Sequence, residues 1–530
     1  MISTHIQRRS VPAKAQAMMA QQGLHPLLAQ LYAARGVTDI ANAQPNLKTL
    51  LDPAELHGID DAAQALSNAI VQGESICVVA DYDCDGATAC AVAVLGLNML
   101  TESAQMVDKA IRGAQVDFFV PNRFETGYGL VPEVVDLVIA KYAAMGKPAP
   151  DWLLTVDNGI ASVAGVAYAA THGIRVCITD HHVAGDVLPD AAVIVNPNQP
   201  ACGFASKHLA GVGVLFYVLL ATRAVMRAQG LFDSATQARL DTLLDLVALG
   251  TVADVVRLDA NNRTLVSAGI ERIRAAALNG TLRAGIQALY AVAGRDPRAA
   301  NATDFGFMIG PRINAAGRLA DMSLGIACLL TDDLEQATRM ATELQKINAT
   351  RRDIQDDMQA QALDNLPSAI APTQASVVAF HADWHQGVVG LVASKLKEQF
   401  WRPAFAFASE NKAAENNAEN KADDNATLRG SGRSIPGLHL RDALDLVSKR
   451  APHLIEKFGG HAMAAGLSLP ARHLDEFTRT LESVCQSLIS PAIAAKVLLT
   501  DGAFNADWCT PDMADMLARS GFGTQTLAYG

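Results

Sequence analysis

The sequence has little cysteine, and what it has is scattered. Its eight cysteines include no C-x-x-C pair, so neither a zinc site nor a disulfide framework is indicated. Residues 1–22 are polar and lack the continuous apolar stretch of a secretory signal. The longest apolar run, 209–222, is too short to span a bilayer and is predicted to be a buried helix. We therefore expect a cytoplasmic protein with reduced thiols and no membrane partner.

The sequence also lacks an excess of positive charge. It has 43 Lys and Arg against 54 Asp and Glu, a formal net charge of −11. This balance does not exclude a nucleic-acid partner, because a local basic groove governs contact with phosphates. Only 18% of the residues are charged and 50% are hydrophobic, which is typical of a globular protein with a large core. A chain of 530 residues is longer than a single hydrophobic core usually supports, so two or three domains are expected.

Three carboxylates stand close together after an apolar run. Residues 75–80 favour a buried strand, and Asp81, Asp83 and Asp85 follow at alternate positions. Carboxylates at this spacing repel one another unless cations offset their charge. A solvated turn would not need three of them, and a calcium-binding EF-hand loop would require Glu where Val92 stands. The pattern favours a metal site at the carboxyl end of a strand, where open α/β sheets place ligands.

From residue 75 onwards, strand and helix patterns alternate, which predicts a parallel sheet with crossover helices. We also expect a strand-like segment in the apolar run 243–249, which leads to Asp254. The expected strands are 75–80, 116–120, 152–156, 175–179 and 192–195, and the expected helices are 87–100, 132–145, 161–172 and 209–229.

Polar residues recur where these segments end. Asp157 follows one strand, and His181 and His182 follow the next. Each alone is typical of a turn or a surface loop, but parallel strands bring their carboxyl ends to one edge. We therefore expect one cluster of acidic side chains with an imidazole. Its members are Asp81, Asp83, Asp85, Asp157, Asp254 and His181.

Oxygen ligands with an imidazole suit Mn²⁺ or Mg²⁺ better than zinc or copper. The cluster has more ligands than one ion needs, so the sequence predicts two ions that act in phosphodiester hydrolysis. Asp157 or Asp85 would bridge them, and a shared water would be the nucleophile. His182 would orient the phosphate or stabilise charge in the transition state.

The second half predicts another α/β unit. Residues 334–366 have few helix breakers and many polar residues, which indicates a long, mostly solvated helix between two lobes. Glycines lie beside Arg433 and His461. They are typical of a surface that approaches a phosphate closely, and they are equally typical of ordinary tight turns. The expected strands are 376–380, 404–408, 428–433 and 465–469, and the glycines are Gly430, Gly432, Gly459 and Gly460.

Four motifs in this order, DYDCDG (81–86), VDNG (156–159), TDHH (179–182) and TVAD (251–254), resemble those of the DHH phosphoesterase superfamily. Four later segments narrow the resemblance, over roughly residues 30–505, to its bacterial exonucleases that are specific for single-stranded DNA. These segments are GPRINAAGRLADM (310–322), DWHQGVVGLVASKLKE (383–398), SGRSIPGLHLRDAL (431–444) and KFGGHAMAAGLSL (457–469).

The resemblance implies an α/β fold in which a parallel-sheet DHH domain is joined by a long helix to a smaller α/β DHH-associated domain. The resemblance also implies an OB-fold after this domain. The chain stops too early for a five-stranded barrel, and its last ten residues depart from the expected pattern. We therefore expect a truncation or an altered reading frame, and weaker DNA binding. The implied segments are an N-terminal lead-in (1–72), the DHH domain (73–333), the connecting helix (334–366), the DHH-associated domain (367–490) with a disordered insertion (409–427), and a partial OB-like segment (491–530).

The resemblance further implies a 5′-to-3′ exonuclease of DNA repair and recombination that releases nucleoside 5′-monophosphates and uses Mn²⁺ or Mg²⁺. Arg123 and Arg433 are expected to grip the 5′ phosphate, since guanidinium groups match phosphate geometry. A helicase and a single-strand-binding protein are candidate partners. The implied nucleic-acid contacts are Arg123, Arg312, Asn314, Arg318, His385, Arg433, Ser434, Gly460 and His461.

Two alternatives exist within the same superfamily. An oligoribonuclease or a cyclic-dinucleotide phosphodiesterase would use similar metal chemistry on short substrates, whereas the chain length and the long helix favour a long one. A non-enzymatic replication scaffold would have lost metal ligands. All the ligand-type residues are present here, which argues against a scaffold.

Overall fold

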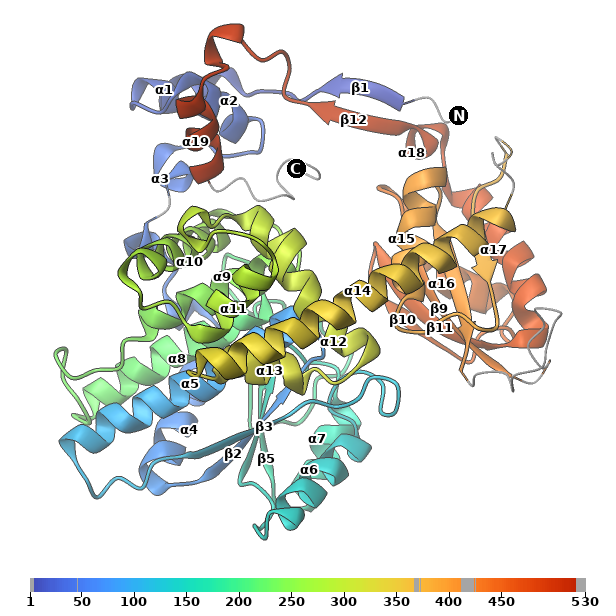
Figure 1. Ribbon diagram of the computed structural model, residues 1–530. Helices are drawn as coiled ribbons and strands as arrows, with labels where there is room; N and C mark the ends of the chain where they lie inside the picture. The colour runs from blue at the N-terminus through green and yellow to red at the C-terminus, as the bar shows by residue number, and fades with distance from the viewer. Residues whose placement is uncertain are drawn as a thin grey trace. The chain divides into compact units, whose positions relative to one another are not determined.

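The computed structural model describes residues 4–44, 46–366, 371, 373–410, 424 and 426–520. The chain divides into two compact units (Figure 1). The large unit comprises Val11–Asn348 and Phe504–Gly530, and the small unit comprises Met1–Ser10 and Ala349–Ala503. Most of the predicted insertion, and the last ten residues with their unusual sequence, lie outside the described residues.

The large unit is built on a parallel sheet of five strands in the order β3-β2-β4-β5-β6. The sheet confirms the predicted α/β architecture, and β2, β4 and β5 have the predicted bounds. The strands are β2 (Ser75–Ala80), β3 (Gln115–Phe119), β4 (Trp152–Val156), β5 (Arg175–Thr179) and β6 (Val193–Val195).

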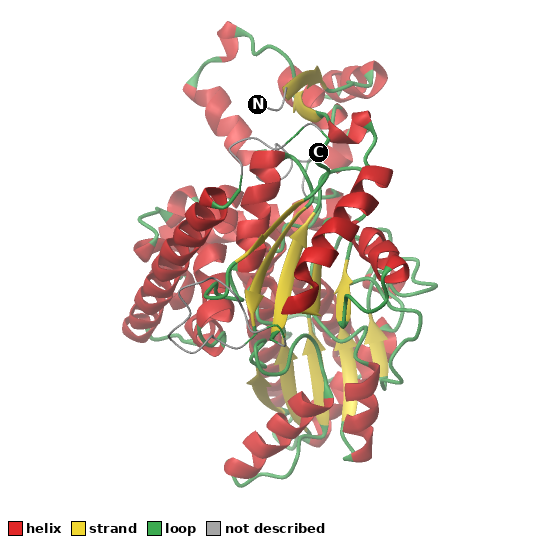
Figure 2. Cartoon of the chain, turned by 90° about the vertical axis from the view of Figure 1, so that its right-hand side faces the viewer, coloured by secondary structure: helices red, strands yellow, loops and turns green. Residues whose placement is uncertain are grey.

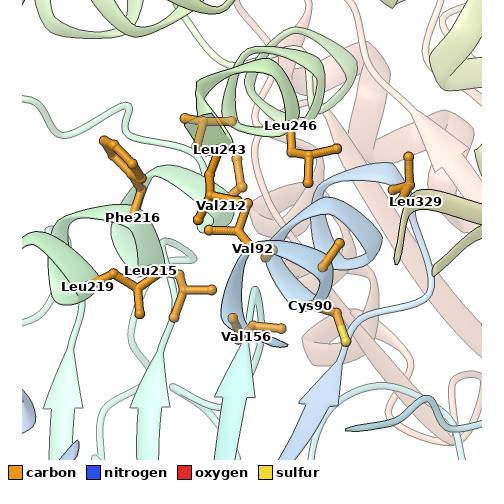
Figure 3. Packing of buried hydrophobic residues seen from close by; sticks show 14 of the residues in the cluster. Cys90, Val92, Val156, Val212, Leu215, Phe216, Leu219, Leu243, Leu246 and Leu329 are labelled. Carbon is orange, nitrogen blue, oxygen red and sulfur yellow. The ribbon is translucent and has the colours of Figure 1, made fainter. Parts of the chain in front are cut away.

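Helices cover both faces of this sheet, which explains why its strands are apolar along their whole length. Ile76 and Val78 of β2 belong to the core beneath α4, α5 and α8, whereas Cys77 and Val79 belong to the core beneath α6 and α7. Figure 3 shows the first of these cores, where Val92 of α5 and Val212 of α8 pack above the strands. The helices are α4 (Ile59–Gln72), α5 (Cys84–Val107), α6 (Pro132–Ala144), α7 (Val163–Thr171) and α8 (Gly211–Ala228).

The predicted strand-like run 243–249 is wrong, because these residues form a helix, α9 (Leu244–Ala253). A short, continuous apolar run has no periodicity that separates a buried strand from a buried helix. Residues Leu244 to Val252 are all buried, so the pattern carried no polar face. The helices that follow are α10 (Ala260–Asn279), α11 (Ala284–Val292), α12 (Gly310–Leu319) and α13 (Ser323–Leu330).

Two helices, α5 and α8, are long and apolar enough to cross a membrane, but most of each lies inside the protein. They are core helices of the large unit, as predicted for the run 209–222. All eight cysteines are free thiols.

The N-terminal segment divides between the units. Helices α1 (Ala13–Gln21), α2 (Pro26–Ala33) and α3 (Ile40–Ala43) share a small core with α19 (Pro511–Arg519) in the large unit. Strand β1 (Thr4–Arg8), which the sequence did not indicate, pairs in parallel with β12 (Lys496–Thr500) in the small unit.

The small unit has a mixed sheet in the order β10-β11-β9-β8-β7, whose strands are yellow in Figure 2. Only β7 and β8 pair in parallel among these described strands. Helix α14 (Leu334–Asp364) enters it from the large unit, as predicted. The strands are β7 (Val377–Phe380), β8 (Ala404–Ser409), β9 (Thr427–Arg433), β10 (Lys457–Gly460) and β11 (Ala464–Pro470), and the helices are α15 (Val389–Phe400), α16 (Leu440–Arg450), α17 (Leu474–Leu488) and α18 (Pro491–Ala494).

Candidate metal centre

The turn from β2 into α5 presents the first carboxylates. Asp83 is the N-cap of α5, and its Oδ1 accepts hydrogen bonds from the amides of Asp85 (2.9 Å) and Gly86 (3.0 Å). Asp81 Oδ1 accepts from the Tyr82 amide at 2.8 Å. A Cβ on Gly86 would lie 2.5 Å from the Asp81 carbonyl oxygen, so only glycine fits this turn.

Asp85 is fully buried, with no exposed surface, and the first turn of α8 holds it. Its Oδ2 accepts from the Gly211 amide at 2.6 Å, and its Oδ1 accepts from the Val212 amide at 3.0 Å. Amides at a helix N-terminus lack partners within the helix and favour a negative charge. The α8 terminus therefore fixes this carboxylate in the interior.

Two more carboxylates approach His181, which follows β5. Its Nε2 lies 3.1 Å from Asp157 Oδ1 and 3.5 Å from Asp254 Oδ2. Asp157 directly follows β4 and has a positive φ of 62°, a conformation that is costly for a residue with a side chain. Asp254 caps the C-terminus of α9, so a helix delivers it rather than the predicted strand.

The structure brings the predicted ligands into overlapping groups, within each of which the ligand atoms lie within 4.8 Å of one another. Asp157 Oδ1 is buried and, apart from the imidazole of His181 at 3.1 Å, meets no hydrogen-bond donor among the residues that the structure describes. A buried acceptor of this kind, beside other oxygens and an imidazole, fits Mn²⁺ or Mg²⁺. The groups are Asp81, Asp83 and Asp157; Asp85, His181 and Asp254; and Asp157, His181 and His182.

The carboxylates are difficult to ionise together. Burial, followed by the charge of Asp83, raises the pKa of Asp81 to about 8 and that of Asp85 to about 7. Burial and the neighbouring carboxylates also raise the pKa values of Asp157 and Asp254 well above the usual range. Cations are what would allow this cluster to be ionised at neutral pH.

His182 is held by Asp180, a residue that the sequence reasoning omitted although it begins the Asp-His-His run. Asp180 Oδ1 lies 2.8 Å from His182 Nδ1 and accepts from the amides of His181 (2.7 Å) and His182 (3.1 Å). Burial opposes the charged imidazole, but the hydrogen bond and charge of Asp180 outweigh it and raise the pKa of His182 to about 9. The Tyr128 hydroxyl lies 3.2 Å from His182 Nδ1. His182 is therefore a positive group beside the acidic cluster.

Arg123 stacks on an aromatic ring beside these groups. Its guanidinium carbon lies 4.5 Å from the centre of the Tyr82 ring, and Tyr82 meets Tyr128 edge to face with ring centres 6.1 Å apart. The sequence reasoning did not single out either tyrosine, although Tyr82 lies inside the motif DYDCDG.

Helix α12 supports the β2–α5 turn. Asn314 Oδ1 accepts from the Cys84 amide at 2.7 Å, and a Cβ on Gly317 would lie 1.8 Å from the Tyr82 carbonyl oxygen. Arg312 is buried and donates to the Met308 carbonyl. Asn314 and Arg312 thus have structural contacts of their own, and their predicted contacts with nucleic acid remain predictions, as does that of the half-buried Arg318.

In the small unit, Arg433 ends β9 and is half-buried. Its Nη1 donates to Ser431 Oγ at 3.0 Å and to the Gly432 carbonyl at 2.8 Å. Ser434 is buried, with 1% exposed, and donates its hydroxyl to the Leu438 carbonyl at 2.7 Å. A direct contact between the Ser434 hydroxyl and substrate would require this turn to open.

The glycines of the small unit have packing reasons. A Cβ on Gly430 or Gly432 would lie 2.2 or 2.3 Å from the ring of Phe407 or Phe405, so these two glycines make room for aromatic rings of the core. Gly460 has a positive φ of 144°. These contacts account for Gly430 and Gly432 without a phosphate.

The two remaining predicted contacts lie in turns of the small unit. His385 Nδ1 accepts from the Gly387 amide at 3.0 Å, just before α15. His461 is exposed, and its amide donates to the Ala464 carbonyl at 2.8 Å. Their roles at nucleic acid remain predictions.

Comparison with known proteins identifies both units. Residues 75–251 match the DHH family, N-terminal domain, and residues 373–487 match the DHHA1 domain. The chain is 46% identical over 503 residues to the single-stranded-DNA-specific exonuclease RecJ of Salmonella typhimurium, and the match covers 94% of this chain and 81% of that protein.

Solved structures agree with this match. The crystal structure of Thermus thermophilus RecJ in complex with Mn²⁺ superposes with a TM-score of 0.73 at 27% identity, covering 99% of this chain and 67% of that one. The Mg²⁺ complex of the same protein gives a TM-score of 0.68 at 26% identity, covering 99% and 65%. At this identity over this length, the chain belongs to the RecJ family of single-stranded-DNA-specific exonucleases.

Proposed function

We propose that this protein is a metal-dependent exonuclease that degrades single-stranded DNA from the 5′ end and releases nucleoside 5′-monophosphates. The observation that carries the proposal is the convergence of Asp157, Asp254 and His181 with Asp81, Asp83 and Asp85 in overlapping groups. Membership of the RecJ family supports the substrate class. The 5′ polarity and the product rest on the resemblance of the motifs to those of the family.

Two divalent ions, Mn²⁺ or Mg²⁺, fit the cluster. Asp81 and Asp83 would hold one ion and Asp85, Asp254 and His181 the other, with Asp157 close to both sets. When bound, such ions supply Lewis acidity at a phosphate and lower the pKa of a coordinated water. The candidate ligands exceed the needs of one ion, which supports two.

The protein's own groups bind and orient the phosphate. The hydrogen bond and charge of Asp180 favour the protonated form of His182, and an imidazolium there would donate to a phosphate oxygen and offset charge in the transition state. Arg123 would add a second positive group near Asp81, held in place by the Tyr82 ring. Asp85, anchored by α8, would keep its ligand geometry without reorganisation.

For recognition of the 5′ end we propose Arg433, because a guanidinium matches phosphate geometry and its neighbours Ser431 and Gly432 already orient it. We also propose that residues 491–530 are part of an OB-like segment, which the strand Lys496–Thr500 supports. The free thiols support a cytoplasmic location.

The test is a nuclease assay on single- and double-stranded DNA labelled at the 5′ or 3′ end, with and without Mn²⁺. We expect Mn²⁺-dependent release of the 5′ label as a mononucleotide from single strands, before the 3′ label appears. Early release of the 3′ label would overturn the polarity. Faster turnover of di- and trinucleotides than of long strands would favour the oligoribonuclease or cyclic-dinucleotide alternative.

A further inference from the structure

Gly211, the first residue of α8, lies against two carboxylates of the candidate metal centre. Its amide donates to Asp85 Oδ2 at 2.6 Å. A Cβ built on Gly211 would lie 2.6 Å from both the Cβ and the Oδ1 of Asp157. Asp85 and Asp157 belong to different groups of potential ligands, so one residue contacts both groups.

The surroundings leave little space for either carboxylate to move. The Val212 amide holds Asp85 Oδ1 at 3.0 Å, and Val212 itself is buried in the core shown in Figure 3. On another side of Asp85, a Cβ on Gly250 of α9 would lie 2.9 Å from Asp85 Oδ1. The Asp157 amide donates to the Thr179 carbonyl at 3.0 Å, which ties its backbone to β5.

We infer that Gly211 is a positioning residue that sets the separation of Asp85 and Asp157, and through it the relative places of the two ions. The inference deepens the proposed function and rests on it. The amide of Gly211 fixes one carboxylate, and the missing side chain lets the other approach. Because real Cβ contacts are longer than the 2.6 Å found here, any larger residue would push Asp157 away from its present place.

The test substitutes Gly211→Ala and measures Mn²⁺ binding by titration calorimetry and by electron paramagnetic resonance, which reports spin coupling between neighbouring Mn²⁺ ions. We expect affinity for one ion to fall about 10- to 100-fold, the usual effect of disturbing a partner of a metal ligand, with loss of the coupled signal. We also expect the factor by which kcat falls to be larger than the factor by which KM for single-stranded DNA changes. Alanine favours a helix more than glycine, so a weaker helix would not explain the loss.

Gly213→Ala on the same helix is the matched control. A Cβ there would lie 2.7 Å from Cδ1 of Leu209, a flexible side chain, and contacts neither carboxylate. We expect this variant to bind Mn²⁺ as the unsubstituted protein does. Mn²⁺ binding and spin coupling unchanged by Gly211→Ala would overturn the inference. Absence of Mn²⁺ binding and nuclease activity in the unsubstituted protein would instead overturn the proposed function.

If Gly211→Ala does not fold, the pair Gly211→Ala with Asp157→Gly decides the matter. Glycine accepts the φ of 62° at position 157 and removes the Cβ and carboxylate that meet the new methyl group. We expect the double variant to recover the melting temperature of Asp157→Gly alone to within a few degrees. Failure to recover would show that Gly211→Ala acts elsewhere and would overturn the inference.

Discussion

Asp157 Oδ1 and His181 Nε2 lie 3.1 Å apart, although 24 positions separate the two residues in the chain. The register of the sheet explains this contact. Strands β4 and β5 are parallel, and Val156 pairs with Thr179, so the residues just beyond both strands leave the same edge. Asp254 reaches the same imidazole from the end of a helix, at 3.5 Å.

The first prediction concerns Asp157. Replacing it with Asn or Ala removes a charge near both candidate ion positions, so we expect the rate of hydrolysis to fall by at least about 1000-fold. The two variants should differ in stability, because Asn tolerates the positive φ at this position better than Ala. We expect Asp157→Ala to be less stable than Asp157→Asn by about 1 kcal/mol. Nuclease assays and thermal unfolding measure both effects, and retained activity in Asp157→Asn would refute the metal-site assignment.

The second prediction concerns pH and metal. The pKa values of Asp81 and Asp85 are raised to about 8 and about 7, so the stability that these groups contribute is present at low pH and is lost as pH rises through that range. The pKa of His182 is raised to about 9, so the stability that this group contributes is also lost as the pH rises from 6.5 to about 9. We expect the metal-free protein to become less stable from about pH 5 to 8.

Mn²⁺ should compensate for this loss, since ionised carboxylates bind it better than protonated ones. At an ion concentration 100 times the dissociation constant, the expected stabilisation is about 2.7 kcal/mol per site. Melting temperatures with Mn²⁺ and with a chelator, compared at pH 5.5 and pH 8, measure it. An Mn²⁺ effect that is larger at pH 5.5 than at pH 8 would contradict this linkage.

The third prediction concerns the pair Asp180 and His182. Asp180→Asn removes the charge that keeps His182 protonated, so the pKa of His182 should fall from about 9 towards its ordinary value near 6.5. If the imidazolium acts on the phosphate, the alkaline limb of the activity profile moves to lower pH by a similar amount. Profiles of kcat/KM against pH for both proteins provide the measurement. An unshifted alkaline limb would remove His182 from this role.

The fourth prediction concerns Arg433. Charge-assisted hydrogen bonds contribute about 1.5–3 kcal/mol, so Arg433→Ala should raise KM for 5′-phosphorylated single strands by about 10- to 150-fold. Strands with a 5′-hydroxyl should change much less. Arg429 lies on the same strand but pairs with Glu410, its Nε 3.0 Å from Oε1, so Arg429→Ala is the matched control. Equal effects of Arg433→Ala on both kinds of end would argue against the proposed grip.

Part of this architecture could be predicted from local pattern. The buried apolar runs of β4 and β5 have the predicted bounds, because both faces of a covered parallel sheet are apolar and the runs end at polar residues. The same logic placed Asp157 and His181 at one edge of the sheet. It failed for the run 243–249, because a buried helix and a buried strand have the same composition.

By itself, the sequence determined the parallel sheet, the long connecting helix and the types of candidate metal ligand, since these depend on periodicity and on residue chemistry. Only the tertiary structure decided that α8 anchors Asp85, that α9 delivers Asp254 and that Asn314 holds the turn after β2. The contacts of α8 with Asp85 and of Asn314 with Cys84 join segments far apart in the chain. Such contacts depend on how helices pack, which no local pattern encodes.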